Sequence, residues 1–329
     1  DVPLIFHAVK KGRTEVICGQ GVMPAKASIA HFKGLGLDLI PGTGLLPACV
    51  PGTFDAYMLM LRDYGTMRVA DVLSPAIGYW LNGHPLVERA SATIATVQEN
   101  FRDNWPSSAA VYLPGNKVPA PASLFRNTAV GNTYARLLKE AEAGGGGREA
   151  EIERARKTWS QGFVAEAIDR FYTQQEILDV SGKRNKGLLR GEDMAKWQAT
   201  VEAPLTYDYG RYTVCKAGPW AQSPVTLQQL ALLKGFNLDG TDPTSADFIH
   251  TVVEASKLAT RKLTSAYEES GSLPAEKPFW SKDGVKLFSD EANFGALDSK
   301  RHKHLSDWLR AHFDRVKPGD YVALLAYVE

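Results

Sequence analysis

Glycine and proline are concentrated between residues 34 and 52, and this stretch limits the fold more than any other part of the chain. Eight of its nineteen residues are glycine or proline, which are disfavoured inside helices and central strands. We therefore predict a long shaped loop over 34–52. The apolar runs before it, Leu4–Val9 and Thr14–Cys18, predict a β-hairpin in which Gly12 takes the positive φ of the turn.

Helical patterns predominate after this loop. The predicted helices cover 53–64, 69–81, 128–143, 161–171, 192–197, 227–233 and 248–267. Residues 104–122 hold four prolines and one glycine and predict an extended loop, and the alternation over 205–214 predicts one half-exposed strand. The run Gly144–Gly147 predicts a link between helices, because no Gly-Lys-Ser/Thr follows it as in a phosphate-binding loop.

Length, charge and cysteine content exclude several classes of protein. The 329 residues are enough for about two domains. Thirty-eight basic and 37 acidic residues leave a charge of +1, so we expect neither a nucleic-acid nor a membrane partner. The separated Cys18, Cys49 and Cys215 predict buried structural thiols and no zinc site.

The start at Asp1 predicts that an upstream segment is missing. The compartment therefore stays open, with the cytoplasm as the first expectation.

The sequence holds no complete catalytic set and no motif for a metal or cofactor, so we expect none of these in this chain. His302 and His304 are interpreted as a solvated basic turn, and His250 as a core or capping residue. Three tyrosines predict cross-strand packing: Tyr207, Tyr209 and Tyr212.

Gly19–Gln20–Gly21 is the strongest candidate for a binding site. Two glycines allow a sharp backbone bend around the amide of Gln20, and that amide can both donate and accept hydrogen bonds. An ordinary turn is the alternative interpretation.

Six segments, in order and with matching spacing, resemble the large subunit of the gamma-glutamyltranspeptidase family over about residues 4–258. They are Gly21–Ala27, Val50–Thr53, Tyr64–Met67, Val72–Ala76, Gly187–Met194 and Pro219–Leu233. The resemblance implies a mixed α/β fold: a partial N-terminal-nucleophile hydrolase large-subunit body, largely helical with short strands, followed by a short helix–strand tail.

The resemblance also implies an amidohydrolase or acyltransferase made by self-cleavage of a precursor into a heterodimer. In this family the new terminal Thr of the small subunit attacks the amide, and its free α-amino group acts as the base. Backbone N–H groups stabilise the oxyanion. No such start occurs in this sequence, so we expect no catalytic residue here and a small-subunit polypeptide as partner.

One departure from the family pattern concerns the substrate. Glutathione-cleaving members place an Arg four residues before the proline that corresponds to Pro24, and here that position holds Gln20. Losing a charged bidentate clamp weakens binding of an α-carboxylate. The predicted substrate-binding residues are Gln20, Gly19 and Gly21, and the predicted substrates are small amides of other types, such as glutaryl or oxamate amides.

The second departure lies at the carboxyl end. Residues 254–329 resemble part of the isomerase half of bifunctional transaldolase/phosphoglucose isomerases, mainly through Asp283–Phe288 and Lys317–Tyr327. We therefore predict two regions, a transpeptidase-like 1–253 and an isomerase-like 254–329. The join is a natural fusion, an engineered chimera or a sequence-assignment error. The alternative functions are a non-catalytic binding or scaffold fragment, or a fusion with a glucose-6-phosphate isomerase fragment, and whether this chain is an enzyme stays open.

Overall fold

The computed structural model describes residues 2–270, and the side chains of residues 2–260. These residues form two compact units. The first contains Val2 and Gly19–Thr200, and the second contains Pro3–Cys18 and the described residues from Val201 onward. The isomerase-like segments 283–288 and 317–327, together with His302 and His304, lie outside the described residues. That part of the predicted tail stays a prediction.

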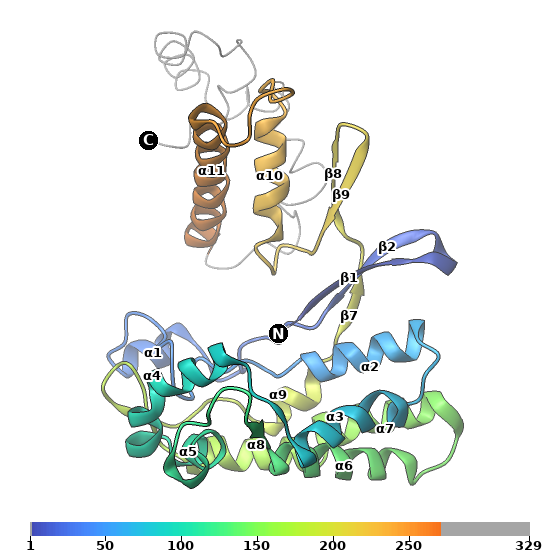
Figure 1. Ribbon diagram of the computed structural model, residues 1–329, viewed down its shortest axis with the longest axis vertical. Helices are drawn as coiled ribbons and strands as arrows, with labels where there is room; N and C mark the ends of the chain where they lie inside the picture. Colours follow the sequence, from blue (N-terminus) through green and yellow to red (C-terminus); the bar gives the residue numbers. More distant parts are fainter. Residues whose placement is uncertain (1, 271–329) are drawn as a thin grey trace. The chain divides into compact units, whose positions relative to one another are not determined.

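The first unit is mainly helical (Figure 1). Its helices are α1 (Ile29–Gly34), α2 (Thr53–Tyr64), α3 (Val69–Asn82), α4 (Glu88–Asn104), α5 (Pro106–Tyr112), α6 (Thr128–Glu142), α7 (Gly147–Gln161), α8 (Phe163–Gln174) and α9 (Gly191–Lys196). Two short strand pairs accompany them, β3 (His84–Pro85) with β4 (Leu124–Phe125), and β5 (Ile177–Leu178) with β6 (Arg184–Asn185). One 3-10 turn covers Pro114–Asn116. The loop predicted over 34–52 is present and precedes α2.

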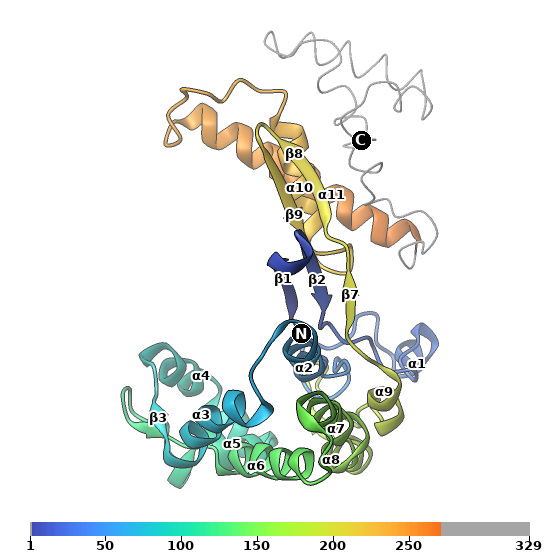
Figure 2. The ribbon, with the colours of Figure 1, turned by 90° about the vertical axis from the view of Figure 1, so that its right-hand side faces the viewer.

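The main core of this unit lies where α2, α3, α6 and α7 meet, and Figure 2 shows α7 beside α6 and α8. Its buried side chains are Phe54, Met58, Val69, Leu137, Ala141, Ile152 and Ala155. The apolar positions recur at helical spacing, so each helix buries one face. A second buried cluster joins Val50 to α8 and α9 through Ala165, Leu189 and Met194. The core thus ties the end of the long loop to the carboxyl end of the unit.

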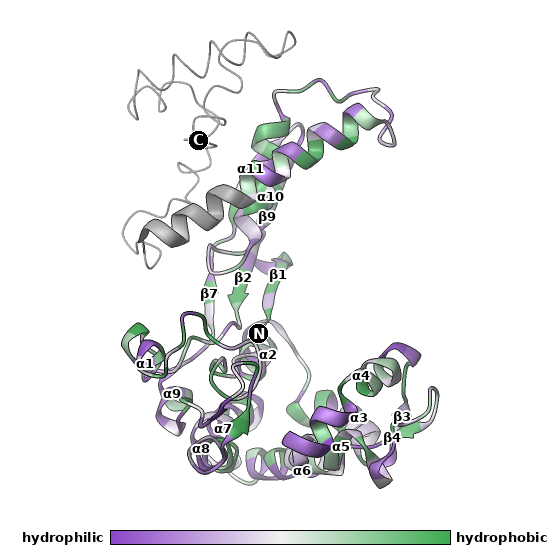
Figure 3. Ribbon diagram, turned by 90° about the vertical axis from the view of Figure 1, so that its left-hand side faces the viewer, coloured by the Kyte–Doolittle hydropathy of each residue, from purple (hydrophilic) through white to green (hydrophobic). Residues whose placement is uncertain are grey.

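The second unit begins with the predicted hairpin of β1 (Pro3–Ala8) and β2 (Arg13–Cys18). Gly12 has φ +62° in the turn, and β7 (Thr200–Glu202) adds a third strand beside β2. A second hairpin follows, β8 (Leu205–Tyr209) and β9 (Tyr212–Lys216). Two helices complete the unit, α10 (Ser223–Leu233) and α11 (Ala246–Ser270). Hydrophobic and hydrophilic residues both occur along α11 (Figure 3), and its apolar Ala255 and Ala259 pack with Leu232 and Leu233 of α10.

Three predictions of local structure were wrong. Residues 104–122 contain α5, because Pro106 occupies the first turn of that helix, where its missing N–H costs nothing. The single strand predicted over 205–214 is a hairpin, since Gly210 takes φ +59° and reverses the chain. His250 is exposed and neither core nor cap. The tyrosine prediction fits this hairpin, in which Tyr209 faces Tyr212 across the strands.

Two further features bear on the predicted organisation. The helix α11 runs continuously through the predicted boundary at 253/254, so that boundary stays a prediction from sequence. None of the helices among the described residues combines the length and the apolar character needed to span a bilayer.

Candidate functional site

Gln20 lies in a loop that leaves β2 and enters the first unit. The backbone before it is fixed to Val2, because the N–H of Gly19 donates to the Val2 carbonyl at 2.9 Å and the N–H of Val2 donates to the Gly19 carbonyl at 3.3 Å. Gln20 itself is half-buried. Its main chain is therefore held by the strand-like pairing immediately before it.

The two flanking glycines are required by close packing. A Cβ on Gly21 would lie 1.7 Å from the carbonyl oxygen of Val50, and one on Gly19 would lie 2.7 Å from the Cβ of Ala56. Neither Gly19 nor Gly21 has a positive φ. The conformational freedom of glycine, on which the predicted bend depended, therefore does not explain why glycine occupies these two positions. They allow neighbouring segments to approach Gln20 from both sides.

The segment Val50–Thr53 packs against the loop of Gln20. The N–H of Val50 donates to the Val22 carbonyl at 3.0 Å. A Cβ on Gly52 would lie 2.7 Å from the Gly19 carbonyl oxygen and 2.4 Å from the indole ring of Trp197. Helix α2 then begins at Thr53, with Gly52 as its N-cap.

Asp193 connects the same loop to α9. Its Oδ1 accepts the backbone N–H of Ala25 at 2.9 Å, and its Oδ2 accepts the N–H of Arg190 at 2.9 Å. The second bond caps the first turn of α9. The side chain of Pro24 is fully buried beside this contact. The sequence analysis missed Asp193, although its position three residues after Arg190 at the start of a helical pattern is a capping signal.

Three of the six segments that carry the sequence resemblance therefore converge in the first unit: Gly21–Ala27, Val50–Thr53 and Gly187–Met194. Behind the third segment, a Cβ on Gly187 would lie 2.1 Å from the ring of Tyr172, whose pKa is raised by burial. The convergence gives Gln20 a rigid backbone surrounding, and the role of Gln20, Gly19 and Gly21 in binding substrate stays a prediction.

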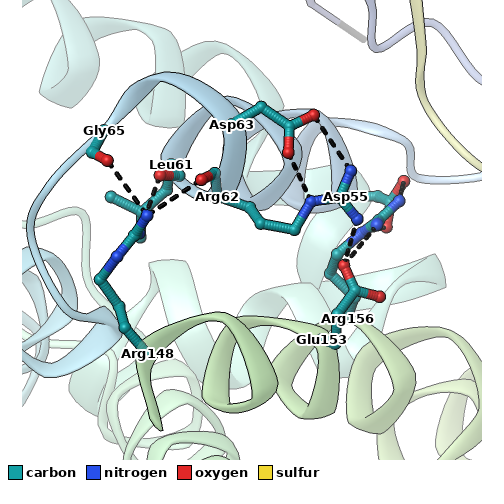
Figure 4. Close-up of polar contacts among 8 residues, drawn as sticks. All are labelled: Asp55, Leu61, Arg62, Asp63, Gly65, Arg148, Glu153 and Arg156. Carbon is teal, nitrogen blue, oxygen red and sulfur yellow. Dashed lines mark hydrogen bonds and ion pairs between the residues drawn. The ribbon is translucent and has the colours of Figure 1, made fainter.

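Two of the other three segments, Tyr64–Met67 and Pro219–Leu233, make contacts that stabilise the fold. Tyr64–Met67 closes α2, where Arg148 donates to the carbonyls of Leu61, Arg62 and Gly65 at 3.0, 2.9 and 3.1 Å (Figure 4). In the second unit, the indole N–H of Trp220 donates to Glu202 at 2.8 Å and Pro224 is fully buried. These contacts place the turn at 220–224 in the packing of the second unit.

A chain of charged side chains joins α2 to α7 (Figure 4). Arg156 donates two hydrogen bonds to Asp55, at 2.6 and 2.9 Å, and the N–H of Ala199 donates to the same carboxylate at 2.7 Å. Arg156 and Arg62 both donate to Glu153, at 2.8 and 2.5 Å. Burial acts to raise the pKa of Glu153, but these two guanidinium groups outweigh it and lower the pKa below its ordinary value. The network holds α2, which begins directly after Gly52, against α7.

No group of three or more His, Cys, Asp or Glu side chains suited to a metal ion occurs among the described residues. Cys18, Cys49 and Cys215 are half-buried, so the prediction that these thiols are buried was wrong. Cys49 lies beside the loop of Gln20, with its sulfur 3.5 Å from that of Met23.

Comparisons with known proteins agree on one family. The family profile of gamma-glutamyltranspeptidase matches residues 1–277. The glutathione hydrolase-like YwrD proenzyme of Bacillus subtilis is 25% identical over 309 residues, which cover 92% of this chain and 53% of that protein. The chain thus spans about half the length of the curated relatives it matches.

Solved structures show the same fold. The structure of LmbA2991HD is 52% identical with a TM-score of 0.74, over 79% of this chain and 44% of that one. The gamma-glutamyltranspeptidase of Helicobacter pylori, at 20% identity, superposes with a TM-score of 0.69 over 97% of this chain and 80% of that one. The predicted fold, a largely helical hydrolase body with short strands, is confirmed. The chain belongs to the gamma-glutamyltranspeptidase family.

Proposed function

We propose that this chain is the large-subunit part of an enzyme that hydrolyses or transfers the acyl group of small amides. The observation that supports this most is the family match over residues 1–277, which includes all the segments that converge on Gln20. The family match, and not a complete catalytic set within the chain, carries the assignment.

The nucleophile comes from a second polypeptide in this proposal. A hydroxyl is a poor nucleophile at neutral pH, and an N-terminal Thr solves the problem because its own α-amino group takes the proton. The Bacillus subtilis relative is called a proenzyme, a name that fits cleavage of a precursor into two chains. The described residues then supply the binding surface, and the small subunit supplies attack and oxyanion stabilisation.

Gln20 selects the acyl group in this proposal. A guanidinium would bind a substrate carboxylate through two charge-assisted hydrogen bonds. The neutral amide of Gln20 offers one donor group and one acceptor, which suits an acyl chain whose polar end is uncharged or singly hydrogen-bonded. We therefore expect non-standard amides whose acyl group has no terminal carboxylate to be preferred over γ-glutamyl amides. A glutaryl group keeps that carboxylate, so the neutral amide of Gln20 does not favour glutaryl amides.

The first test is the intact mass of the protein purified from its native source, with N-terminal sequencing of every chain. A second chain that begins with Thr supports the proposal. A single species would contradict it and would favour a binding or scaffold role for the fold.

The second test is the ratio of kcat/KM on γ-glutamyl p-nitroanilide and on pentanoyl p-nitroanilide, which has the same five-carbon acyl chain without the carboxylate, measured with the two-chain assembly. We expect Gln20→Arg to move this ratio toward the γ-glutamyl substrate by about tenfold or more, the worth of a charge-assisted pair. Val22→Arg is the control, because it adds the same charge in the same loop on a side chain that is 57% exposed. An equal shift in both variants, or none in either, would remove Gln20 from the binding site.

A further inference from the structure

Asp193 joins two segments that lie 168 residues apart in the sequence. One carboxylate oxygen accepts from Ala25, five residues after Gln20, and the other accepts from Arg190 at the start of α9. A carboxylate that accepts two backbone N–H groups makes stronger hydrogen bonds than a neutral acceptor would. The side chain of Asp193 thus attaches the loop of Gln20 to α9.

The contacts that immediately flank Gln20 are of a different kind. Gly19 pairs with Val2 through backbone hydrogen bonds, and Gly21 lies against the Val50 carbonyl. These contacts fix where the loop begins. The Asp193 bond fixes where it ends, so the two together determine the path of the backbone that carries Gln20.

We propose that Asp193 is a positioning residue for substrate binding, which acts through the placement of Gln20. This inference rests on the proposed function. Asp193 touches no reacting atom in this proposal, and its removal lets the segment after Val22, which is itself bonded to Val50, shift. Productive substrate binding then weakens, while the chemical step on bound substrate is little changed.

The chain contains a matched control for the capping part of this role. Asp71 stands three residues after Arg68 in α3, and its Oδ2 accepts the Arg68 N–H at 3.0 Å. This is the same helix-capping bond that Asp193 makes to Arg190. The capping bond of Asp71 involves no residue of the loop of Gln20, so Asp71→Ala removes a cap alone.

The experiment measures kcat and KM separately for the two-chain assembly carrying Asp193→Ala, Asp71→Ala, Gln20→Ala, or Gln20→Ala with Asp193→Ala. We expect Asp193→Ala to raise KM about tenfold on the preferred anilide, as for the loss of a charge-assisted bond, with kcat within about twofold. Asp71→Ala leaves KM within about twofold of wild type. Once Gln20 is absent, Asp193→Ala raises KM no further, because coupled residues have non-additive effects.

Asp193→Asn keeps the inference testable should Asp193→Ala not fold. Its amide oxygen accepts only one of the two N–H groups and its NH2 faces the other, so we expect a KM clearly above that of wild type. Two outcomes overturn this inference and leave the proposed function standing. In the first, Gln20→Ala changes KM but Asp193→Ala has no more effect than Asp71→Ala. In the second, the effects of Gln20→Ala and Asp193→Ala on KM simply add. Absence of turnover by the wild-type assembly overturns the proposed function, and this inference with it.

Discussion

Gly21 shows how the absence of one side chain fixes the path of a binding loop. The ideal Cβ position at residue 21 is occupied by the carbonyl oxygen of Val50, which belongs to backbone and cannot rotate away. Alanine can adopt the backbone conformation of Gly21, because φ is not positive there. Its Cβ would nevertheless collide with the Val50 carbonyl oxygen, so close packing and not conformational freedom requires glycine at this position.

We therefore expect Gly21→Ala to lower the free energy of unfolding by about 1–3 kcal/mol, the usual cost of overpacking. Urea-induced unfolding followed by tryptophan fluorescence measures it. Gly42→Ala is the control, since nothing lies within 4 Å of its Cβ and its φ is not positive, and we expect a change within about 0.5 kcal/mol. Equal stabilities of the two variants would contradict the close approach at Gly21.

The sequence allowed part of the candidate site to be predicted at this scale. Gln20 was predicted as a substrate-binding residue because it stands four residues before Pro24 within a motif, and Gly19 and Gly21 because they flank it. Asp193 was missed because its partner Ala25 contributes only a backbone N–H, which leaves no trace in residue type. The glycines were found for the wrong reason, because packing against Val50 and Ala56 depends on segments that sequence patterns do not place in space.

At the scale of elements, the ion pair between Asp55 and Arg156 is a buried polar contact between α2 and α7. Both side chains are nearly buried, at 9% and 8% exposed. A buried pair adds little net stability by itself, but leaving one charge without its partner is expensive.

We expect Arg156→Met to destabilise the protein by about 3–5 kcal/mol, because it leaves the Asp55 carboxylate buried and charged. Adding Asp55→Leu to that variant removes the unpaired charge and should restore part of the loss. Urea unfolding of wild type, single and double variants compares them, and a double variant as unstable as the single one would refute this account.

Glu153 makes the contribution of α7 to the free energy of unfolding depend on pH. Its pKa in the folded chain lies below the ordinary value of 4.5 because of Arg156 and Arg62. The unfolded chain therefore binds the proton first as the pH falls, so this stabilisation is complete above about pH 4.5 and is lost as the pH drops through the folded pKa. Thermal unfolding midpoints between pH 6 and pH 3 should decline less steeply in Glu153→Gln than in wild type, and parallel curves would argue against this role.

Elements were predictable where local signals agree with packing. The hairpin at Gly12 and the helices α2, α3 and α6 follow from turn glycines and apolar periodicity. Helix α4 was not predicted, since its mixture of alanine, threonine and charged residues gives a weak apolar stripe. Helix α5 was hidden by prolines that count as breakers in a sequence but are tolerated at a helix start.

At the scale of the whole molecule, the proposed function predicts that the 329-residue chain is catalytically inert by itself. The reason is that the nucleophile, the base and the oxyanion donors belong to the proposed small subunit. Purified chain should give no release of p-nitroaniline from γ-glutamyl or glutaryl anilide above the no-protein blank. Turnover by this chain alone, with no second polypeptide in the intact mass, would sink the two-chain proposal.

The sheet of the second unit has a consequence for how the protein is made. Strand β2 ends at Cys18, and its neighbour β7 begins at Thr200, so the ribosome synthesises about 180 residues between the two. At about 5–20 residues per second, this interval lasts roughly ten to forty seconds. Val16 and Ile17, which are fully buried in the folded protein, are on a strand with an unpaired edge throughout it. The nascent hairpin must therefore wait for the first unit to be translated, and this is the interval in which a chaperone would protect the chain from aggregation.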